Sequence, residues 1–319
     1  MSTPVPPFSA KSSLIQTSQL VFPAAVQVCR KTPLTLPDMD MSHFLATELR
    51  TRKLDKLYEQ LWLAGLPIPA HSLQRQRLMG REMYITERPD EHLVWHKTKL
   101  LVKPLPDYLL CHSFWIENLC SDVTLYWSAA GFLLSYTWLI GHKSDFVLAC
   151  EINLIPPGVD WLAWTEFMKD FLRNIDLSTL AQVDRRYHYG ELRLSRLNSL
   201  MRFLPSMWSY ENFIWGYLST SRWYQALFER NFSWLLTAFV FISVPLSAMQ
   251  VGLSTQQLGG NQPFDTLAYG IALLAIALVL LATGAAWLVW FVLFCYHLFS
   301  TIKLDRRIRV ERNIGLSRA

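Results

Sequence analysis

Cysteine is scarce in this sequence, with five residues among 319, and no two of them form a CxxC pair. An odd number of widely spaced thiols does not make a disulfide framework, so we expect a reducing compartment for most of the chain. Charged residues are also few, at 17%, and the net charge is only +5. A charge balance this close to neutral gives no reason to expect nucleic acid as a partner.

Catalytic and targeting motifs are missing as well. The sequence contains no GxSxG elbow, no GxxxxGK[ST] phosphate loop, no GxGxxG and no kinase signature. The N-terminus lacks the basic and apolar regions of a secretory signal, so no cleaved leader is expected. The sequence therefore predicts no catalytic residue, no cofactor and no metal, and it favours a protein that is not an enzyme.

Two pairs of residues look like sites, and each has a simpler explanation. His92 and His96 are four residues apart without a glutamate between them, and in a strand they would merely share a face. Cys111 and His112 are adjacent, and neighbours on a helix point in different directions. Ordinary packing is the better interpretation of both pairs.

Hydrophobic residues are what the chain has in excess, at 51%, with 13% aromatic residues, which excludes disorder throughout. Residues 231–264 and 266–302 carry no Asp, Glu, Lys or Arg. About 20 apolar residues cross a bilayer core of roughly 30 Å as a helix, so we predict transmembrane helices at 232–251 and 267–294. The predicted fold is a mainly α integral membrane protein in which a cytosolic helical domain with a small β-hairpin precedes a two-helix transmembrane hairpin.

The orientation follows from the flanking charges. The tail, residues 303–319, has six basic and two acidic residues, a net charge of +4, whereas the loop 252–266 has no basic residue. Cytoplasmic segments collect Lys and Arg, so both termini of this multi-pass protein should face the cytosol. The bilayer is then the first predicted partner, and the tail residues expected at its surface are Lys303, Arg306, Arg307 and Arg309.

Aromatic residues crowd the segment 208–231, just ahead of the first predicted crossing. Rings with polar edges favour the headgroup level, so the segment either lies along the membrane surface or forms the seam between domain and membrane helices. Arginines at 185, 186, 193, 196 and 202 can reach anionic headgroups there, although solvated helix faces carry such charges too. The aromatic residues expected at the interface are Trp208, Trp215, Trp223, Tyr224, Trp234, Trp287 and Trp290.

The chain before these segments is expected to have two parts. Residues 1–37 are rich in proline and read as a disordered arm, and residues 38–207 form the cytosolic domain. In that domain we predict a helix that is capped by Ser42 and runs to Ala64, and further helices at 107–120, 161–175 and 191–204. A hairpin near 82–103 is predicted to turn at Arg88-Pro89-Asp90. Polar residues at 184, 188, 189 and 191 are candidates for a cleft, with no sequence pattern that brings them together.

A third apolar stretch, residues 123–140, is close to the minimum length for a crossing. Basic residues lie on both sides of it, so a single crossing there would place positive charge in both compartments. We predict a buried helix of the cytosolic domain instead.

Five blocks of the sequence are distinctive: LAGLPIPA at 63–70, LQRQRLMGR at 73–81, SDFVLACEINLIPP at 144–157, YGELRLSRLN at 189–198 and LSAMQVGLS at 246–254. Together they resemble a family of uncharacterised filamentous-fungal proteins that share a domain of unknown function. The resemblance covers roughly residues 42–302. It implies a fungal source and a C-terminal two-helix membrane anchor, and it supplies no activity and no site residues.

These observations favour a membrane-tethered binding or scaffold protein whose cytosolic domain recognises a protein or lipid partner. The alternative is a membrane-bound enzyme that acts on a lipid or another apolar substrate. A channel or carrier subunit would need oligomers, because two helices cannot enclose a pore. Small residues at 243 and 247, and at 282, 284 and 286, offer helix faces for a homo-oligomer, although such patterns are common.

Overall fold

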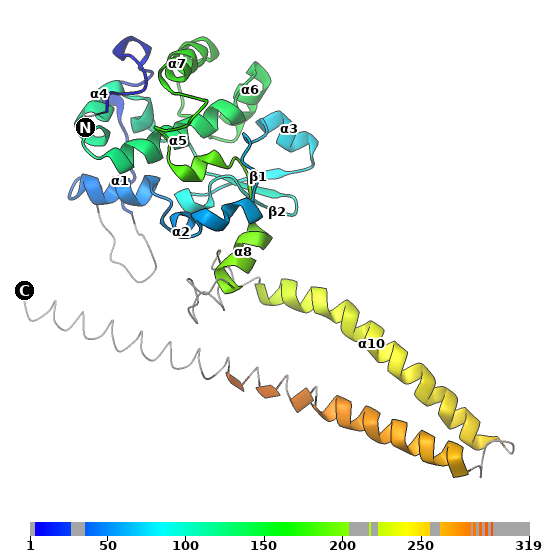
Figure 1. The fold of residues 1–319 in the computed structure, drawn as a ribbon. Coiled ribbons are helices and arrows are strands. Elements are labelled where there is room, and N and C mark those ends of the chain that lie inside the picture. Colours follow the sequence, from blue (N-terminus) through cyan, green and yellow to red (C-terminus); the bar gives the residue numbers. More distant parts are fainter. Residues whose placement is uncertain are drawn as a thin grey trace, which may run out of the picture. The chain divides into compact units, whose positions relative to one another are not determined.

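The computed structural model describes residues 4–26, 36–203, 217, 223–255 and 262–281, together with 283, 284, 287, 288, 291, 292 and 295. The chain divides into two units, Met1–Thr220 and Ser221–Ala319. The first is mainly helical with a small mixed sheet, and the second is helical where it is described (Figure 1).

The sheet of the first unit has four short strands in the order β1-β3-β2-β4: β1 (Glu82–Ile85), β2 (Val94–His96), β3 (Lys99–Val102) and β4 (Leu192–Arg193). β3 pairs antiparallel with β2 and parallel with β1, and β4 pairs parallel with β2. The predicted turn at Arg88-Pro89-Asp90 is therefore wrong. Strand β3 lies between β1 and β2, so these two strands do not pair as a hairpin. Residues Pro89–Glu91 form a 3-10 turn, η4, in the connection between them. The hairpin turns instead at Lys97, whose φ is 53°.

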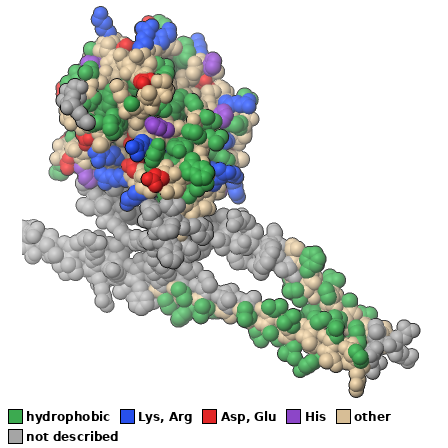
Figure 2. Space-filling view, viewed as in Figure 1, with side chains coloured by type: hydrophobic (Ala, Val, Ile, Leu, Met, Phe, Trp, Pro, Cys, Tyr) green, Lys and Arg blue, Asp and Glu red, His purple; other side chains and the backbone are tan. Residues whose placement is uncertain are grey.

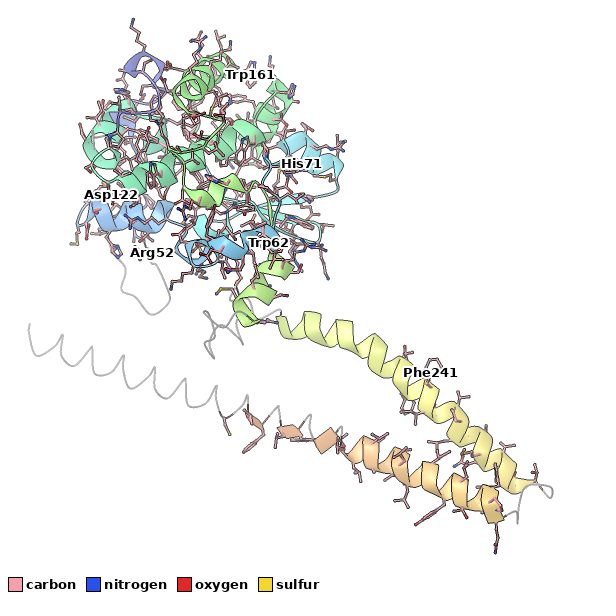
Figure 3. All side chains as sticks on the ribbon, in the orientation of Figure 1. Arg52, Trp62, His71, Asp122, Trp161 and Phe241 are labelled. Atoms are coloured by element: carbon pink, nitrogen blue, oxygen red, sulfur yellow. The ribbon has the colours of Figure 1, made fainter. Side chains whose placement is uncertain are left out.

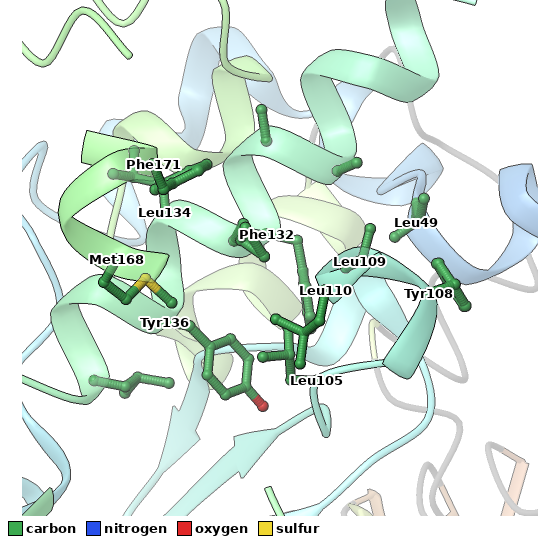
Figure 4. Packing of buried hydrophobic residues seen from close by; sticks show 14 of the residues in the cluster. Leu49, Leu105, Tyr108, Leu109, Leu110, Phe132, Leu134, Tyr136, Met168 and Phe171 are labelled. Atoms are coloured by element: carbon green, nitrogen blue, oxygen red, sulfur yellow. The ribbon is translucent and has the colours of Figure 1, made fainter. Parts of the chain in front are cut away.

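Helix α5 (Val123–Leu139) occupies the centre of the first unit. Asp122 caps it by accepting hydrogen bonds from the backbone N–H groups of Thr124 and Leu125. Twelve of its seventeen residues are buried, and Phe132, Leu134 and Tyr136 pack among neighbouring apolar side chains (Figure 4). The prediction of a buried helix here is confirmed. Helix α6 (Lys143–Glu151) follows after a bend of 113°.

Helix α7 (Trp161–Asn174) confirms the helix predicted at 161–175. The carboxylate of Asp160 accepts a hydrogen bond of 2.6 Å from the backbone N–H of Ala163, which satisfies one of the free donors at the helix start. The buried residues fall at i, i+3, i+4 and i+7, which places them on one face against the core. They are Trp164, Phe167, Met168 and Phe171.

The long helix predicted from Ser42 to Ala64 is broken into α1 (Met41–Leu49), α2 (Arg52–Asp55) and the 3-10 helix η3 (Tyr58–Leu63). The physical reason is the five-residue step from Leu49 to Leu54. Residues five apart on a straight helix point about 140° apart, so one face cannot bury both. The break allows Leu49 to enter the main core and Leu54 to enter a second, smaller core.

The remaining elements are short. The helix predicted at 107–120 consists of η5 (Asp107–Leu110), α4 (His112–Phe114) and a π-helical turn, η6 (Trp115–Leu119). The helix predicted at 191–204 begins as strand β4 and continues as α8 (Leu194–Phe203). The others are η1 (Ala10–Ser12), η2 (Thr17–Gln19), α3 (Leu73–Leu78) and η7 (Arg185–His188).

The N-terminal segment, residues 4–26, corrects the expectation of a disordered arm. Phe8 is buried in the main core and Ile15 lies at its edge. The backbone N–H of Leu14 donates to the carbonyl of Leu110, and the hydroxyl of Tyr126 donates to the carbonyl of Val5. A proline-rich segment cannot form a hydrophobic core by itself, but Phe8 and Ile15 pack into the core of the domain. The rest of the predicted arm, residues 1–3 and 27–35, lies outside the described residues.

The second unit contains α10 (Trp223–Ser254), with Pro245 inside it, and a helix at Gln262–Leu281 that runs in the opposite direction (Figure 1). The second of these helices is long and apolar enough to cross a membrane, and only 6% of its apolar stretch is buried. In α10 the described apolar stretch is shorter, Phe239–Ser254. Hydrophobic side chains cover the described surfaces of both helices (Figure 2), and Phe241 of α10 is 75% exposed (Figure 3).

Candidate functional site

A pocket of about 220 Å³ opens on the first unit where the chain between η3 and α3 meets β2, β4 and the first turn of α8. Three of the five distinctive sequence blocks contribute to it. We call it the Arg193 pocket, and its lining residues are Ala64, Gly65, Leu66, Ile68, Pro69, His71, Arg81, Trp95, Glu191, Arg193 and Arg196.

Two glycines, Gly65 and Gly190, allow the backbone near residues 64–70 to lie close to the backbone near residues 190–193. The N–H of Gly190 donates to the carbonyl of Ile68 at 2.9 Å, and the N–H of Arg193 donates to the carbonyl of Ala64 at 2.8 Å. A Cβ at Gly190 would lie 2.3 Å from the backbone nitrogen of Ala70, and one at Gly65 would lie 2.4 Å from the carbonyl oxygen of Glu191. Neither contact is possible for a larger residue without a backbone shift.

Glu191 is the centre of a hydrogen-bond network in the pocket wall. Its carboxylate accepts from the backbone N–H of His71 (3.0 Å), the Nδ1 of His71 (2.8 Å), the amide of Gln76 (2.6 Å) and the guanidinium of Arg81 (2.5 Å). Burial alone would raise the pKa of Glu191, but these donors outweigh burial and the pKa is lowered. Glu191 is therefore an ionised structural group that neutralises Arg81.

Two guanidinium groups lie against the ring system of Trp95. The carbon of the Arg81 guanidinium is 4.4 Å from the ring centroid, and that of Arg193 is 5.0 Å from a ring of the same indole. Arginines stack readily on aromatic faces, which orients the planar donors. In the described part of the chain Arg193 has no carboxylate partner. Arg196 donates to the carbonyl of Leu63 at 3.0 Å and likewise has no acidic partner there.

Apolar side chains are exposed next to these arginines. Trp62, Leu66 and Ile68 are 61%, 65% and 51% exposed. Trp62 and His71 mark the two ends of this stretch in Figure 3. The surface therefore combines excess positive charge with exposed apolar groups.

The candidate cleft residues of the sequence separate in the structure. Glu191 lines the pocket, whereas Asp184 caps η7 and accepts a hydrogen bond from Ser128 at 3.1 Å. Tyr189 packs against Tyr58, and neither Tyr189 nor His188 lines the pocket. Of the five arginines considered for headgroup contacts, Arg193 and Arg196 line the pocket. Arg186 is buried and donates to the carbonyls of His92 and Tyr189.

His92 makes a contact with Ser135 that sequence reasoning missed. The Nε2 of His92 lies 2.8 Å from the hydroxyl of Ser135, which resembles a nucleophile and its base. However, the Nδ1 accepts from the backbone N–H of Lys103, so Nε2 carries the proton and cannot take one from Ser135. Burial lowers the pKa of His92, and the residue serves as a neutral connector in the core.

The two pairs of metal or thiol candidates do not form sites. Within the described residues no group of three or more His, Cys, Asp and Glu side chains is placed to hold a metal ion. Cys111 is buried with its sulfur 3.7 Å from the hydroxyl of Thr17, while the ring of His112 packs edge-on against Phe8. The side chains of this pair contact different neighbours, which fits the packing interpretation.

Most of the predicted membrane-interface residues lie outside the described residues: Trp208, Trp215, Trp290, Lys303, Arg306, Arg307 and Arg309. Trp223, Tyr224 and Trp234 lie within helix α10, where the structure describes only their backbone. Trp287 is 69% exposed. Tyr217, from the same aromatic segment, is buried in the smaller core of the first unit. Its backbone N–H donates to Asn198 at 2.8 Å and its carbonyl accepts from Lys53 at 3.2 Å.

Comparisons with curated proteins and with solved structures found no match. Residues 41–279 match a protein family described as a family of unknown function, DUF6601. The match spans most of the first unit, all of α10 and nearly all of the helix Gln262–Leu281. The chain therefore belongs to the DUF6601 family.

Proposed function

We propose that this chain is a membrane-anchored binding protein, in which a two-helix hairpin tethers the first unit at the cytosolic face of a bilayer. The helix Gln262–Leu281 carries this proposal. It has 20 residues, enough for about 30 Å, and its apolar side chains have almost no protein around them. Such a helix needs an apolar solvent, and lipid supplies one.

The first crossing of the hairpin is assigned to α10. Its described apolar stretch, Phe239–Ser254, spans only about 24 Å as a helix. The absence of Asp, Glu, Lys and Arg extends back to residue 231, however, and 24 helical residues span about 36 Å. The basic tail and the loop without basic residues then favour two cytosolic termini. The sequence blocks also lead us to infer a filamentous-fungal source.

Chain connectivity would hold the first unit at the membrane. Tyr217 is fixed in that unit, and α10 begins six residues later. Six residues span at most about 20 Å when fully extended. With α10 leading into the bilayer, this short connection would tether the first unit to the membrane.

The composition of the Arg193 pocket favours binding over catalysis. Its lining contains no Ser, Thr, Cys or Lys to serve as a nucleophile. Glu191 is occupied by three side chains and a backbone N–H, with a lowered pKa, which suits it poorly as a general base or acid near neutral pH. The free guanidinium donors of the pocket suit recognition of an anion.

The membrane assignment can be tested with the full chain carrying a different epitope at each end. We expect the wild type to stay in the membrane pellet after alkaline carbonate extraction. Ile271→Lys and Leu274→Lys together should release much of it, because each Lys near the centre of the helix Gln262–Leu281 costs about 2.5 to 3.5 kcal/mol. Lysines at Leu162 and Leu177, exposed in the first unit, are the matched control and should change nothing.

Sidedness is read from protease treatment of sealed vesicles. Removal of both epitopes supports the hairpin with cytosolic termini. Protection of one end alone would mean an odd number of crossings, and release of the wild type by carbonate would overturn the anchor itself. For the binding role, proximity labelling of the full chain should give neighbours that residues 232–319 alone do not. Identical neighbours would contradict that role.

A further inference from the structure

We propose that the Arg193 pocket binds the phosphate of an anionic phospholipid headgroup. This inference rests on the proposed function, because it needs the first unit to work at a membrane surface. Its starting point is the charge of the pocket. Three arginines line it and one carboxylate, Glu191, is committed to Arg81. Among the described residues, Arg193 and Arg196 are left without an acidic partner.

The geometry of the arginines suits a phosphate. Arg193 is held over the Trp95 ring and Arg196 is fixed by one hydrogen bond to the Leu63 carbonyl. Each keeps N–H groups without a partner in the described part of the chain, and both residues line the same pocket. Planar, oriented guanidinium groups bind phosphate oxygens through paired charge-assisted hydrogen bonds. A phosphate monoester, with up to two negative charges, matches the two unpaired cations.

The size of the pocket limits the ligand. Pockets for drug-sized molecules have about 300 to 1,000 Å³, and this one has about 220 Å³. It accommodates a small headgroup and leaves no room for acyl chains. The exposed side chains of Leu66 and Ile68 belong to the pocket, and Trp62 is exposed nearby. Acyl chains of a lipid held by its phosphate would lie against these apolar groups, which a soluble phosphate ester would leave uncovered.

The test uses the purified full chain in a nonionic, phosphate-free detergent and isothermal titration calorimetry. The probes are dioctanoyl phosphatidic acid, which presents a phosphate monoester, dioctanoyl phosphatidylcholine, whose phosphate is a capped diester, and inorganic phosphate. We expect phosphatidic acid to bind at least tenfold more tightly than either of the others. Arg193→Gln and Arg196→Gln should each weaken its binding about tenfold or more, because charge-assisted hydrogen bonds are lost.

Two further variants separate the sources of the phosphate. Arg173→Gln, at an exposed position on α7 outside the pocket, is the matched control and should bind phosphatidic acid like the wild type. Leu66→Ser with Ile68→Ser should weaken phosphatidic acid binding while leaving inorganic phosphate binding unchanged. Thermal unfolding of every variant confirms that the first unit is intact.

The proposal is overturned if the wild type binds no phosphatidic acid, or if Arg173→Gln lowers the affinity as much as the pocket variants do. Equal affinity for phosphatidic acid and inorganic phosphate, insensitive to the Leu66 and Ile68 changes, would overturn the lipid source and assign the pocket to soluble phosphate esters. Carbonate extraction of the same variants distinguishes an error in the pocket assignment from an error in the proposed membrane anchor. A pelleted chain without phosphate binding refutes the pocket alone, and a released chain refutes the proposed function.

Discussion

The substitution Phe8→Ala tests whether the N-terminal segment is part of the domain. The ring of Phe8 is 2% exposed and lies edge-on to three rings, with centroid distances of 5.9 Å to His112, 5.9 Å to Trp115 and 4.7 Å to Phe167. Removing a phenylalanine from a packed core costs about 3 to 5 kcal/mol. Because Phe8 is the main apolar anchor near the chain end, this loss falls on the docking of the segment.

The consequence is a large rise in the detached population. Each 1.4 kcal/mol changes an equilibrium about tenfold, so a loss of about 3 kcal/mol raises the open form roughly a hundredfold. Proteolysis of an opened segment follows that population when opening and closing are fast. We therefore expect trypsin to cleave after Lys11 about a hundred times faster in Phe8→Ala than in the wild type, as followed by intact mass spectrometry.

Val5→Ala is the control, because the Val5 side chain is 74% exposed and its contact with Tyr126 is made by the backbone carbonyl. It should leave the cleavage rate nearly unchanged. If Phe8→Ala were cleaved no faster than Val5→Ala, the segment would behave as a loose arm, as its proline content alone suggests, and its buried position would be refuted.

Three further predictions concern the first unit of the full chain. Glu191→Gln leaves Arg81 without a carboxylate and should cost about 3 kcal/mol in urea unfolding. Gly131→Ala places a Cβ 2.2 Å from the buried Tyr187 ring. Overpacking of about 1 to 3 kcal/mol should exceed the helix-propensity gain of about 1. Burial and nearby Asp184 raise the pKa of Asp55 from 3.8 to about 6. The contribution of Asp55 to stability should therefore fall as pH rises from about 4 to 6, and Asp55→Asn should remove this part of the pH dependence.

Each of these predictions has a clear contrary result. Gly141→Ala adds a Cβ with no atom within 4 Å and should be tolerated, so equal losses at the two glycines would argue against the Tyr187 contact. For Asp55 the folded state binds the proton more tightly than the unfolded chain, and a stability that rises between pH 4 and 6 in the wild type but not in Asp55→Asn would reverse that sign. An unchanged unfolding midpoint in Glu191→Gln would show that the network around Arg81 contributes little.

Local sequence patterns predicted the elements that are governed by local physics. Helix α7 has a capping aspartate and apolar residues on one face, and both signals are visible within fifteen residues. The step from Leu49 to Leu54 was also visible, but its meaning depends on two separate cores that only tertiary structure creates. The hairpin turn was misplaced for a related reason, because strand order is decided by long-range pairing and not by where a proline lies.

The Arg193 pocket depends still more on distant contacts. Residues near 65, 81, 95 and 193 meet because β4, only two residues long, pairs with β2 at Val94↔Leu192 and Trp95↔Arg193. A two-residue strand has no periodicity from which it can be predicted. The sequence offered Arg193 and Arg196 as basic residues and Glu191 as a cleft candidate. It gave no sign that Glu191 would neutralise Arg81 and leave the other two arginines unpaired.

Two apolar segments of the chain show why composition alone does not identify a membrane helix. Helix α5 contains no Asp, Glu, Lys or Arg, and the helix Gln262–Leu281 contains only Asp265, near its start. An apolar surface on all sides requires apolar surroundings on all sides. For α5 the protein provides them, since most of the helix is buried in the first unit. For Gln262–Leu281 only 6% of the apolar stretch is covered by protein, and this unmet requirement is the basis of the proposal that lipid surrounds the helix.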